Sequence, residues 1–193
     1  MTFDVAKSKF IEAYSFNIQR EGSEALFDYI CNSDFFEAPA STRFHLCEPG
    51  GLCVHSLHVW SELNGLLKFY NEMRKPPNSF DYSTETIAIC GLLHDLCKIN
   101  TYSVDYRNKK NDVGEWEKVP VYVREEKEPY GNHGAKSVFT IMQYMKLSQE
   151  EASAIQCHMG NEDGKYATSD VYATNPLAWF LHVADEAATY LDE

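Results

Sequence analysis

The residues of this chain with the clearest capacity for chemistry are histidines and aspartates on the apolar faces of predicted helices. Five of them fall where helical periodicity turns side chains inward: His55, His94, Asp95, His158 and Asp185. Burying an unpaired carboxylate in a helical core costs several kcal/mol. Imidazole nitrogens and carboxylate oxygens both bind divalent cations, and a shared cation would remove that cost. The sequence therefore predicts a buried metal centre, with a hydrogen-bonded buried polar cluster as the alternative.

Two helices position the first half of this set. Apolar residues at helical spacing predict a helix over residues 51–74, which Pro76-Pro77 ends and which carries His55 on its buried face. Ser83 is a plausible N-cap for a helix over residues 83–98, which contains the adjacent His94 and Asp95. The sequence thus predicts that these three side chains face one core.

The second half of the set follows in the last third of the chain. Helices resume near residue 134, directly after His133 in the stretch "YGNHG". The stretch from Ser148 to Glu151 reads as a capping box for a helix that reaches His158. We expect a polar loop over residues 159–174, then a helix over 175–191 that carries Asp185, with Asn175 as its N-cap.

The remaining segments carry little obvious chemistry. We expect two N-terminal helices within residues 1–40, before a core that spans residues 45–191. From residue 101 to 124 the apolar period changes from helical to alternating, around a turn-rich tip, which predicts a β-hairpin inserted into a helical protein. Pro120 marks an edge position in that hairpin. The fold class expected is therefore all-α, a helical bundle in one domain of 193 residues with a small hairpin at 101–124.

Composition excludes several classes of function. The formal net charge of −12 is unfavourable for a broad nucleic-acid-binding face. The six cysteines form no CxxC pair, which argues against a structural zinc site of the usual spacing. With no long apolar run and no signal-like N-terminus, we expect a cytoplasmic protein without a membrane partner.

The order of these motifs resembles the HD-domain metal-dependent phosphohydrolase superfamily. The resemblance is carried by "GGLCVHSLHV", "LLHDLCK", the glycine-flanked His133, "CHMG" at His158 and "LHVADEAATYLD", and covers roughly residues 45–191. With its two extra histidines the chain is similar to HD-type 3′-to-5′ exoribonucleases and to HD-GYP cyclic-dinucleotide phosphodiesterases. The resemblance implies an HD-domain helical bundle.

The resemblance also implies a set of metal ligands. One divalent cation would be held by His55, His94, Asp95 and Asp185. Asp95 would bridge to a second cation completed by His133 and His158. Such a mixed site suits Mn, Fe, Co, Ni or Mg rather than thiolate-bound zinc. The chemistry implied is attack of a metal-generated hydroxide on a phosphoryl group, with the cations neutralising its charge.

Further residues are candidates for catalysis and substrate binding. Lys98 follows Asp95 by three positions, so on a helix its ammonium can hold Asp95 or contact a substrate phosphate. Residues 98–136 carry eight Lys/Arg against seven Asp/Glu in an otherwise acidic chain, which points to an anionic ligand there. Within it, Arg107 at the hairpin tip is a candidate phosphate contact, with a plain solvated turn as the alternative. The remaining candidates for substrate contact are His45, Gly50 and Gly51 ahead of the helix that carries His55.

The sequence therefore predicts a metal-dependent phosphohydrolase whose partner is a small phosphorylated substrate such as a nucleotide, with no extended nucleic acid. Asp95 and Lys98 are the expected catalytic residues. Two alternatives stay open at this point. One is a 3′-to-5′ exonuclease or phosphodiesterase acting on short single strands or cyclic dinucleotides. The other is a catalytically silent nucleotide-binding HD module.

Overall fold

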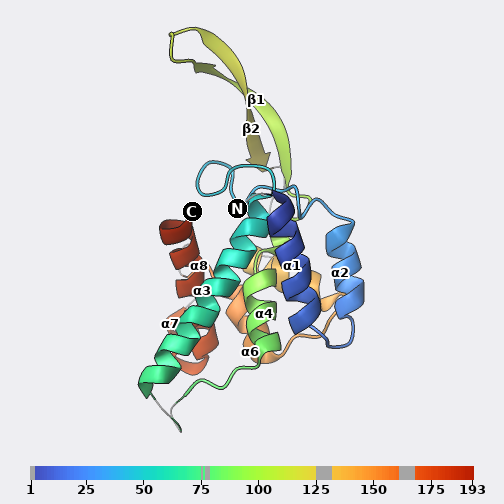
Figure 1. Ribbon diagram of the computed structural model, residues 1–193, viewed down its shortest axis with the longest axis vertical. Coiled ribbons are helices and arrows are strands. Elements are labelled where there is room, and N and C mark those ends of the chain that lie inside the picture. Colours follow the sequence, from blue (N-terminus) through green and yellow to red (C-terminus); the bar gives the residue numbers. More distant parts are fainter. Residues whose placement is uncertain (1–2, 75, 77–78, 125–131, 161–167) are drawn as a thin grey trace.

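A computed structural model of the chain describes residues 3–74, 76, 79–124, 132–160 and 168–193. These residues form a body of α-helices from which one two-stranded antiparallel sheet projects (Figure 1). The helices of the body are α1 (Phe3–Asn17), α2 (Ser23–Cys31), α3 (Gly51–Arg74), α4 (Thr84–Leu93), α5 (His133–Met142), α6 (Gln149–Gln156), α7 (Thr168–Thr174) and α8 (Pro176–Ala187). A mostly helical fold with a small hairpin is thus confirmed. Among the described residues no helix is long and apolar enough to cross a membrane.

Helix α3 is the element around which the body is arranged. It packs against α1, α4 and α8, and it runs across the body in Figure 1. Its apolar stripe, which includes Leu52, Val59 and Leu63, is almost fully buried. Burial of such a stripe supplies most of the stability of a helix in a protein. His55 lies on the same buried face, as its spacing predicts.

The α4 segment differs from the expected continuous helix over residues 83–98. Ser83 caps α4 by accepting a hydrogen bond from the Thr86 amide, as predicted, but α4 ends at Leu93. A turn follows, and then a short 3₁₀ helix, η1 (Leu96–Lys98). Asp95 sits in this turn with a non-helical backbone (φ −108°, ψ 22°). Because of this break, the direction in which the Asp95 side chain points is not fixed by the periodicity of α4.

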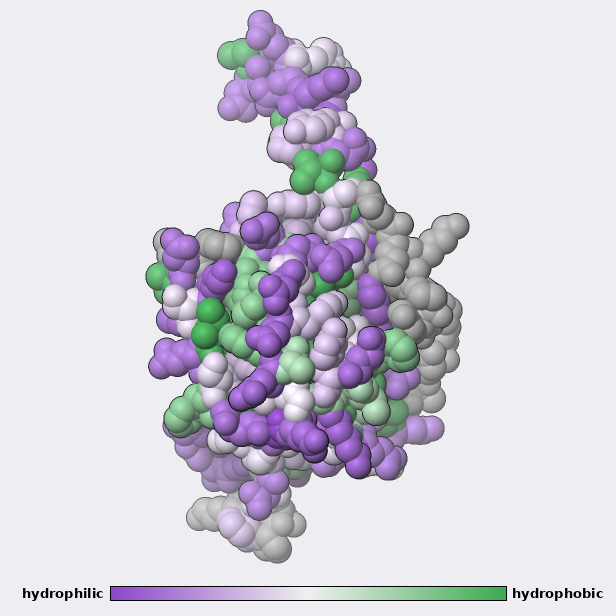
Figure 2. Space-filling model, turned by 90° about the vertical axis from the view of Figure 1, so that its right-hand side faces the viewer, coloured by the Kyte–Doolittle hydropathy of each residue, from purple (hydrophilic) through white to green (hydrophobic). Residues whose placement is uncertain are grey.

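The hairpin predicted for residues 101–124 is formed by β1 (Tyr102–Lys110) and β2 (Trp116–Arg124). Tyr102 pairs with Arg124 at its base and Lys110 with Trp116 near its tip. Pro120, which has no amide hydrogen to donate, is tolerated because a two-stranded sheet consists only of edge strands. The hairpin stands clear of the body in Figure 1 and Figure 2, and mixes hydrophilic and hydrophobic side chains on its surface.

The C-terminal helices begin largely as their sequences indicate. Ser148 and Glu151 form the predicted capping box of α6. Pro176 is the first residue of α8. Asn175, however, does not cap α8 with its side chain; it bonds instead to the Glu150 carbonyl and the Ser153 hydroxyl, which ties α8 to α6. Part of the expected loop 159–174 is helical, as α7, and residues 161–167 lie outside the described part of the chain.

One buried ion pair joins the N-terminal segment to the rest of the body. The Arg20 guanidinium donates to both carboxylate oxygens of Glu151 at 2.8 Å, and Glu85 accepts a further bond at 3.2 Å. The Glu151 side chain is 1% exposed, so its charge depends on these donors and on Ser148 and Thr86. Burial alone would raise the pKa of Glu151, but the hydrogen bonds and charge of Arg20, together with the bonds from Ser148 and Thr86, outweigh burial and lower it.

We predict that Arg20→Ala lowers the free energy of unfolding at pH 7 by about 3 kcal/mol, because it leaves the Glu151 carboxylate buried without its cation. The pKa values of Glu85 and Glu151 are both lowered in the folded state. Their contribution is therefore present above the unfolded pKa of about 4.3 and is lost as pH falls through the folded values. Urea unfolding should show that the difference between wild type and variant shrinks below about pH 4.

The matched control is Arg43→Ala, which removes an arginine from an exposed position. We expect this variant to stay within about 0.5 kcal/mol of the wild type. An equal loss of stability in the two variants would contradict the role given to the Arg20–Glu151 pair.

Candidate metal centre

The structure brings the predicted ligands of the first cation together in the core. His55 Nε2 lies 3.1 Å from Asp185 Oδ1 and 3.7 Å from Asp95 Oδ2. His94 Nε2 lies 3.5 Å from Asp95 Oδ2 and 3.4 Å from His55 Nε2. The two histidines and Asp95 are at most 3% exposed. Two helices, α3 and α8, and the turn after α4 therefore converge on one small volume.

The predicted ligands of the second cation lie beside this group. His158 is fully buried just after α6, with Nε2 3.5 Å from Asp95 Oδ1. His133, the first residue of α5, places its ring 5.6 Å from that of His158, centroid to centroid. Asp95 thus presents one oxygen to His55 and His94 and the other to His158, the arrangement that a bridging carboxylate would have.

In His94 and His158, the hydrogen bond made by Nδ1 decides which ring nitrogen can bind a cation. His94 Nδ1 lies 2.9 Å from the Gly91 carbonyl and His158 Nδ1 lies 2.6 Å from the Ile155 carbonyl. A carbonyl only accepts hydrogen bonds, so both Nδ1 atoms must carry the hydrogen and donate. In the neutral ring this leaves Nε2 with its lone pair directed at the centre of the cluster. Metal-binding histidines are commonly held by such bonds on their other nitrogen.

The residues present fit a divalent cation because acceptors face acceptors across the centre. In its neutral form the His158 ring would turn a lone pair toward Asp95 Oδ1, and its Nε2 forms no hydrogen bond within the described residues. His94 Nε2 and His55 Nε2 face each other in the same way. Such contacts require positive charge between the atoms, either protons or a metal ion. Among the described residues three groups satisfy the spacing for a cation: His55, His94 and Asp185; His94, Asp95 and His158; and His45, His55 and Glu193.

The electrostatics of the metal-free cluster follow from the same contacts. Burial would lower the pKa of His55, but its bonds to Asp185 and Glu193 outweigh burial and raise it to about 9. Burial would raise the pKa of Asp95, yet Lys98 and His94 hold it well below its usual range. Burial would also raise the pKa of Asp185, but the hydrogen bond and charge of His55, with the charges of His94 and His158, lower it. In the absence of a metal, a proton on His55 therefore offsets part of the charge of the two carboxylates.

Lys98 binds Asp95 directly. Its ammonium is 2.6 Å from Asp95 Oδ2 and 2.6 Å from the Ala40 carbonyl. Burial would lower the pKa of Lys98, but the charge and hydrogen bond of Asp95, together with the nearby Tyr102 and Cys97, outweigh burial and raise it. Of the two roles that the sequence leaves open for this lysine, the geometry matches that of holding Asp95 in place.

A cavity of about 650 Å³ opens onto the cluster. Its walls include residues from both halves of the chain: Ala40, Ser41, Thr42, Phe44, His45, His55, Asp95, Lys98, Tyr102, Arg124, His133, Met159, Asp185, Glu186, Thr189, Tyr190 and Glu193. Cavities of this size enclose small-molecule ligands. The cations Lys98 and Arg124, in a chain of net charge −12, make this part of the wall suited to an anion.

The four remaining candidates for substrate contact have different positions. His45 lines the cavity and stacks near His55, with ring centroids 4.9 Å apart and both ring nitrogens buried without a hydrogen-bond partner among the described residues. Arg107 lies in the exposed part of β1, away from the cavity wall. Gly50 and Gly51 do not line the cavity, and their amides bond to the Glu37 and Glu48 carbonyls. Contact of the last three with substrate stays a prediction.

The backbone conformation and the packing of the loop explain why glycine occupies positions 50 and 51. Gly50 has a left-handed backbone (φ 81°), a conformation that favours glycine. A Cβ on Gly51 would lie 2.1 Å from the Leu46 carbonyl oxygen. The glycines therefore let the loop before α3 pack tightly against the start of that helix.

Sequence reasoning missed two members of the site. Arg124 lines the cavity from the base of β2, where Tyr102 pairs with it. Glu193 contacts His55 Nδ1 at 3.1 Å from its Oε1 atom. The strand alternation could have suggested Arg124 as a partner of the hairpin base. No local pattern in the sequence marks Glu193, because its partner is 138 residues away.

Comparison of the chain with protein-family models, with curated proteins and with solved structures found no match in any of the three. The function of the cluster therefore has to be inferred from its geometry and chemistry.

We predict that Mn²⁺ raises the melting temperature of the metal-stripped protein. A cation at a hundredfold excess over its Kd stabilises the folded state by about 2.7 kcal/mol, which corresponds to roughly 5–10 °C for a chain of this length. A thermal scan with and without the ion measures the shift. Asp185→Asn should lose most of it, whereas Asp170→Asn, an exposed charge on α7, should keep it. Equal shifts in both variants would contradict the assignment of Asp185.

Proposed function

We propose that this protein is a metal-dependent phosphohydrolase of the HD-domain type that cleaves a small phosphorylated substrate such as a nucleotide. The observation that carries the proposal is the convergence of imidazole nitrogens and two carboxylates, at the spacing needed to hold a cation, at the edge of a cavity that Lys98 and Arg124 also line. The order of the motifs along the chain supports it independently.

The residues that would hold the cations divide into two overlapping sets. His55, His94, Asp95 and Asp185 would hold one ion, and Asp95, His133 and His158 the other. Mn, Fe, Co, Ni and Mg all suit these ligands. Bound cations would supply a hydroxide nucleophile near neutral pH and would neutralise charge on the phosphoryl group.

The other residues of the site would prepare this chemistry. Lys98 holds Asp95 Oδ2, so the carboxylate keeps one orientation and stays ionised. His45, with two buried and unpaired nitrogens, can contact a phosphate oxygen or the leaving group. Burial and the nearby His55 and Lys98 charges lower the pKa of His45, so this imidazole is neutral at pH 7 and can either accept or donate a hydrogen bond.

The shape and charge of the cavity favour a small substrate over a strand. The cavity of about 650 Å³ is bounded by the loop before α3, the hairpin base and the segment after α8. Its walls hold the aromatic rings of Phe44, Tyr102 and Tyr190, against which a nucleobase could stack. The acidic net charge offers no continuous path for a phosphate backbone.

We predict that Asp95→Ala lowers kcat/KM for a phosphoester by at least about 1,000-fold, because it removes the carboxylate shared by both cation sets. The assay is a panel of nucleoside mono-, di- and triphosphates, cyclic nucleotides and short oligonucleotides with added Mn²⁺, combined with elemental analysis of the purified protein. Asp170→Asn is the control. Absence of a bound transition metal, or hydrolysis unaffected by Asp95→Ala, would sink the proposal.

We further predict that Arg124→Ala raises KM for the preferred phosphorylated substrate by roughly tenfold, the value of one charge-assisted contact. Because Arg107 lies outside the cavity, Arg107→Ala should change KM by less than Arg124→Ala does. Steady-state kinetics at two salt concentrations give a second result. A small-molecule enzyme should show a shallow salt dependence, and a steep loss of activity would favour a strand as substrate.

A further inference from the structure

His55 differs from the other two buried imidazoles in what holds its Nδ1 atom. His94 and His158 follow the ends of α4 and α6, and each Nδ1 lies within hydrogen-bond distance of a carbonyl in the last helical turn, where carbonyls lack the regular partner four residues on. His55 lies inside the long helix α3, where the carbonyls serve the hydrogen bonds of the helix itself. It therefore needs an acceptor from elsewhere in the chain.

That acceptor is Glu193. His55 Nδ1 lies 3.1 Å from Oε1 and 3.2 Å from Oε2 of this carboxylate. The Glu193 side chain is 0% exposed, although the residue as a whole is exposed. Both carboxylate oxygens lie within hydrogen-bond distance of Nδ1, so Glu193 can accept the hydrogen that this nitrogen carries.

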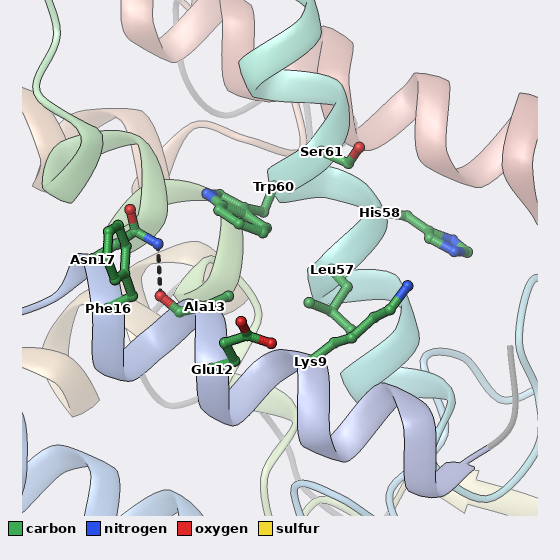
Figure 3. A pocket seen from close by; sticks show the side chains of 9 residues that line it. All are labelled: Lys9, Glu12, Ala13, Phe16, Asn17, Leu57, His58, Trp60 and Ser61. Atoms are coloured by element: carbon green, nitrogen blue, oxygen red, sulfur yellow. Dashed lines mark hydrogen bonds between the residues drawn. The ribbon is translucent and has the colours of Figure 1, made fainter.

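A second histidine fixes the carboxylate. His58 follows His55 by three positions on α3, and its Nδ1 lies 3.0 Å from Glu193 Oε1. His58 also lines a groove between α1 and α3 with Lys9 and Leu57, and its ring points away from the helix at one end of that groove (Figure 3). The chain of contacts thus runs from the metal cluster through Glu193 to a partly exposed imidazole.

Two of the three carboxylates around His55 come from the C-terminal part of the chain. Asp185 on α8 faces His55 Nε2 at 3.1 Å, and Glu193 reaches Nδ1 after the wider turn of the π-helix η2 (Ala188–Asp192). Helix α8 and the segment after it therefore contact the two nitrogens of a single ring, α8 through Asp185 and the following segment through Glu193.

We propose that Glu193 is a positioning residue of the metal centre, held by His58, which fixes His55 with Nε2 toward the cations. This inference rests on the proposed function, since it assigns Glu193 to the same cation site. Glu193 acts through His55 and is not itself a ligand. A geometric alternative exists, because His45, His55 and Glu193 lie close enough together to hold a cation among themselves.

The test is titration of the metal-stripped protein with Co²⁺, followed by its visible absorption and by competition with a chelator. Glu193→Ala should weaken Co²⁺ binding by about 10- to 100-fold, the usual cost of losing the partner of a metal-bound histidine. Glu193→Gln, which keeps an amide oxygen as acceptor, should recover part of the loss. Asp192→Asn removes an exposed carboxylate one position away and should bind Co²⁺ as the wild type does.

The number of bound ions separates the two roles. If Glu193 positions His55, the Glu193→Ala variant at saturating Co²⁺ holds as many ions per chain as the wild type, at lower affinity. Loss of one ion would overturn the inference in favour of a ligand role, and unchanged affinity would overturn it outright. In either case the wild type still binds Co²⁺, so the proposed function stands. A wild-type protein that binds no Co²⁺ would overturn both.

Discussion

The charge of Asp95 is the constraint on which the rest of the site depends. This carboxylate is 3% exposed, and a buried carboxylate persists only where cations or donors surround it. Lys98 supplies a cation on one oxygen, and the imidazoles of His55, His94 and His158 surround the rest. The turn after α4 makes this arrangement possible. In a continuous helix, helical periodicity would decide which way the Asp95 side chain points.

The same constraint explains why the thiol next to the cluster is not part of it. Cys97 Sγ lies 3.7 Å from Asp95 Oδ1. Burial and the Asp95 charge raise the pKa of Cys97 to about 12, so the thiol keeps its proton. A protonated thiol is a poor metal ligand. The donor set at the centre is thus imidazole and carboxylate.

Much of this arrangement is encoded in local patterns. The inward faces of α3, α4 and α8 can be read from helical periodicity, and this is enough to predict that His55, His94 and Asp185 meet. The hairpin and the Ser148 capping box follow from strand alternation and from side-chain spacing. These features depend on a few neighbouring residues, so one sequence suffices to predict them.

Features that depend on distant contacts could not be predicted in this way. The end of α4 at Leu93 is coupled to contacts of the next turn, such as the bond from the Cys97 amide to the Ser137 hydroxyl on α5. Arg124 lines the cavity and Arg107 does not, because the base of the hairpin joins the body and the strand register pairs Arg124 with Tyr102 at that base. Gly50 and Gly51 resemble an anion-binding junction in sequence, but their amides are used by carbonyls of the preceding loop.

The hairpin has a further consequence for how the cavity behaves over time. An isolated two-stranded ribbon is marginally stable in water, and this one has no third strand within the described residues. Its opening is therefore a local event whose free energy is smaller than that of global unfolding. Because Tyr102 and Arg124 belong both to the ribbon and to the cavity wall, fraying at the ribbon base would loosen one side of the cavity while the helical core stays intact. Amide hydrogen exchange in β1 and β2 would then measure how often the hairpin side of the cavity opens.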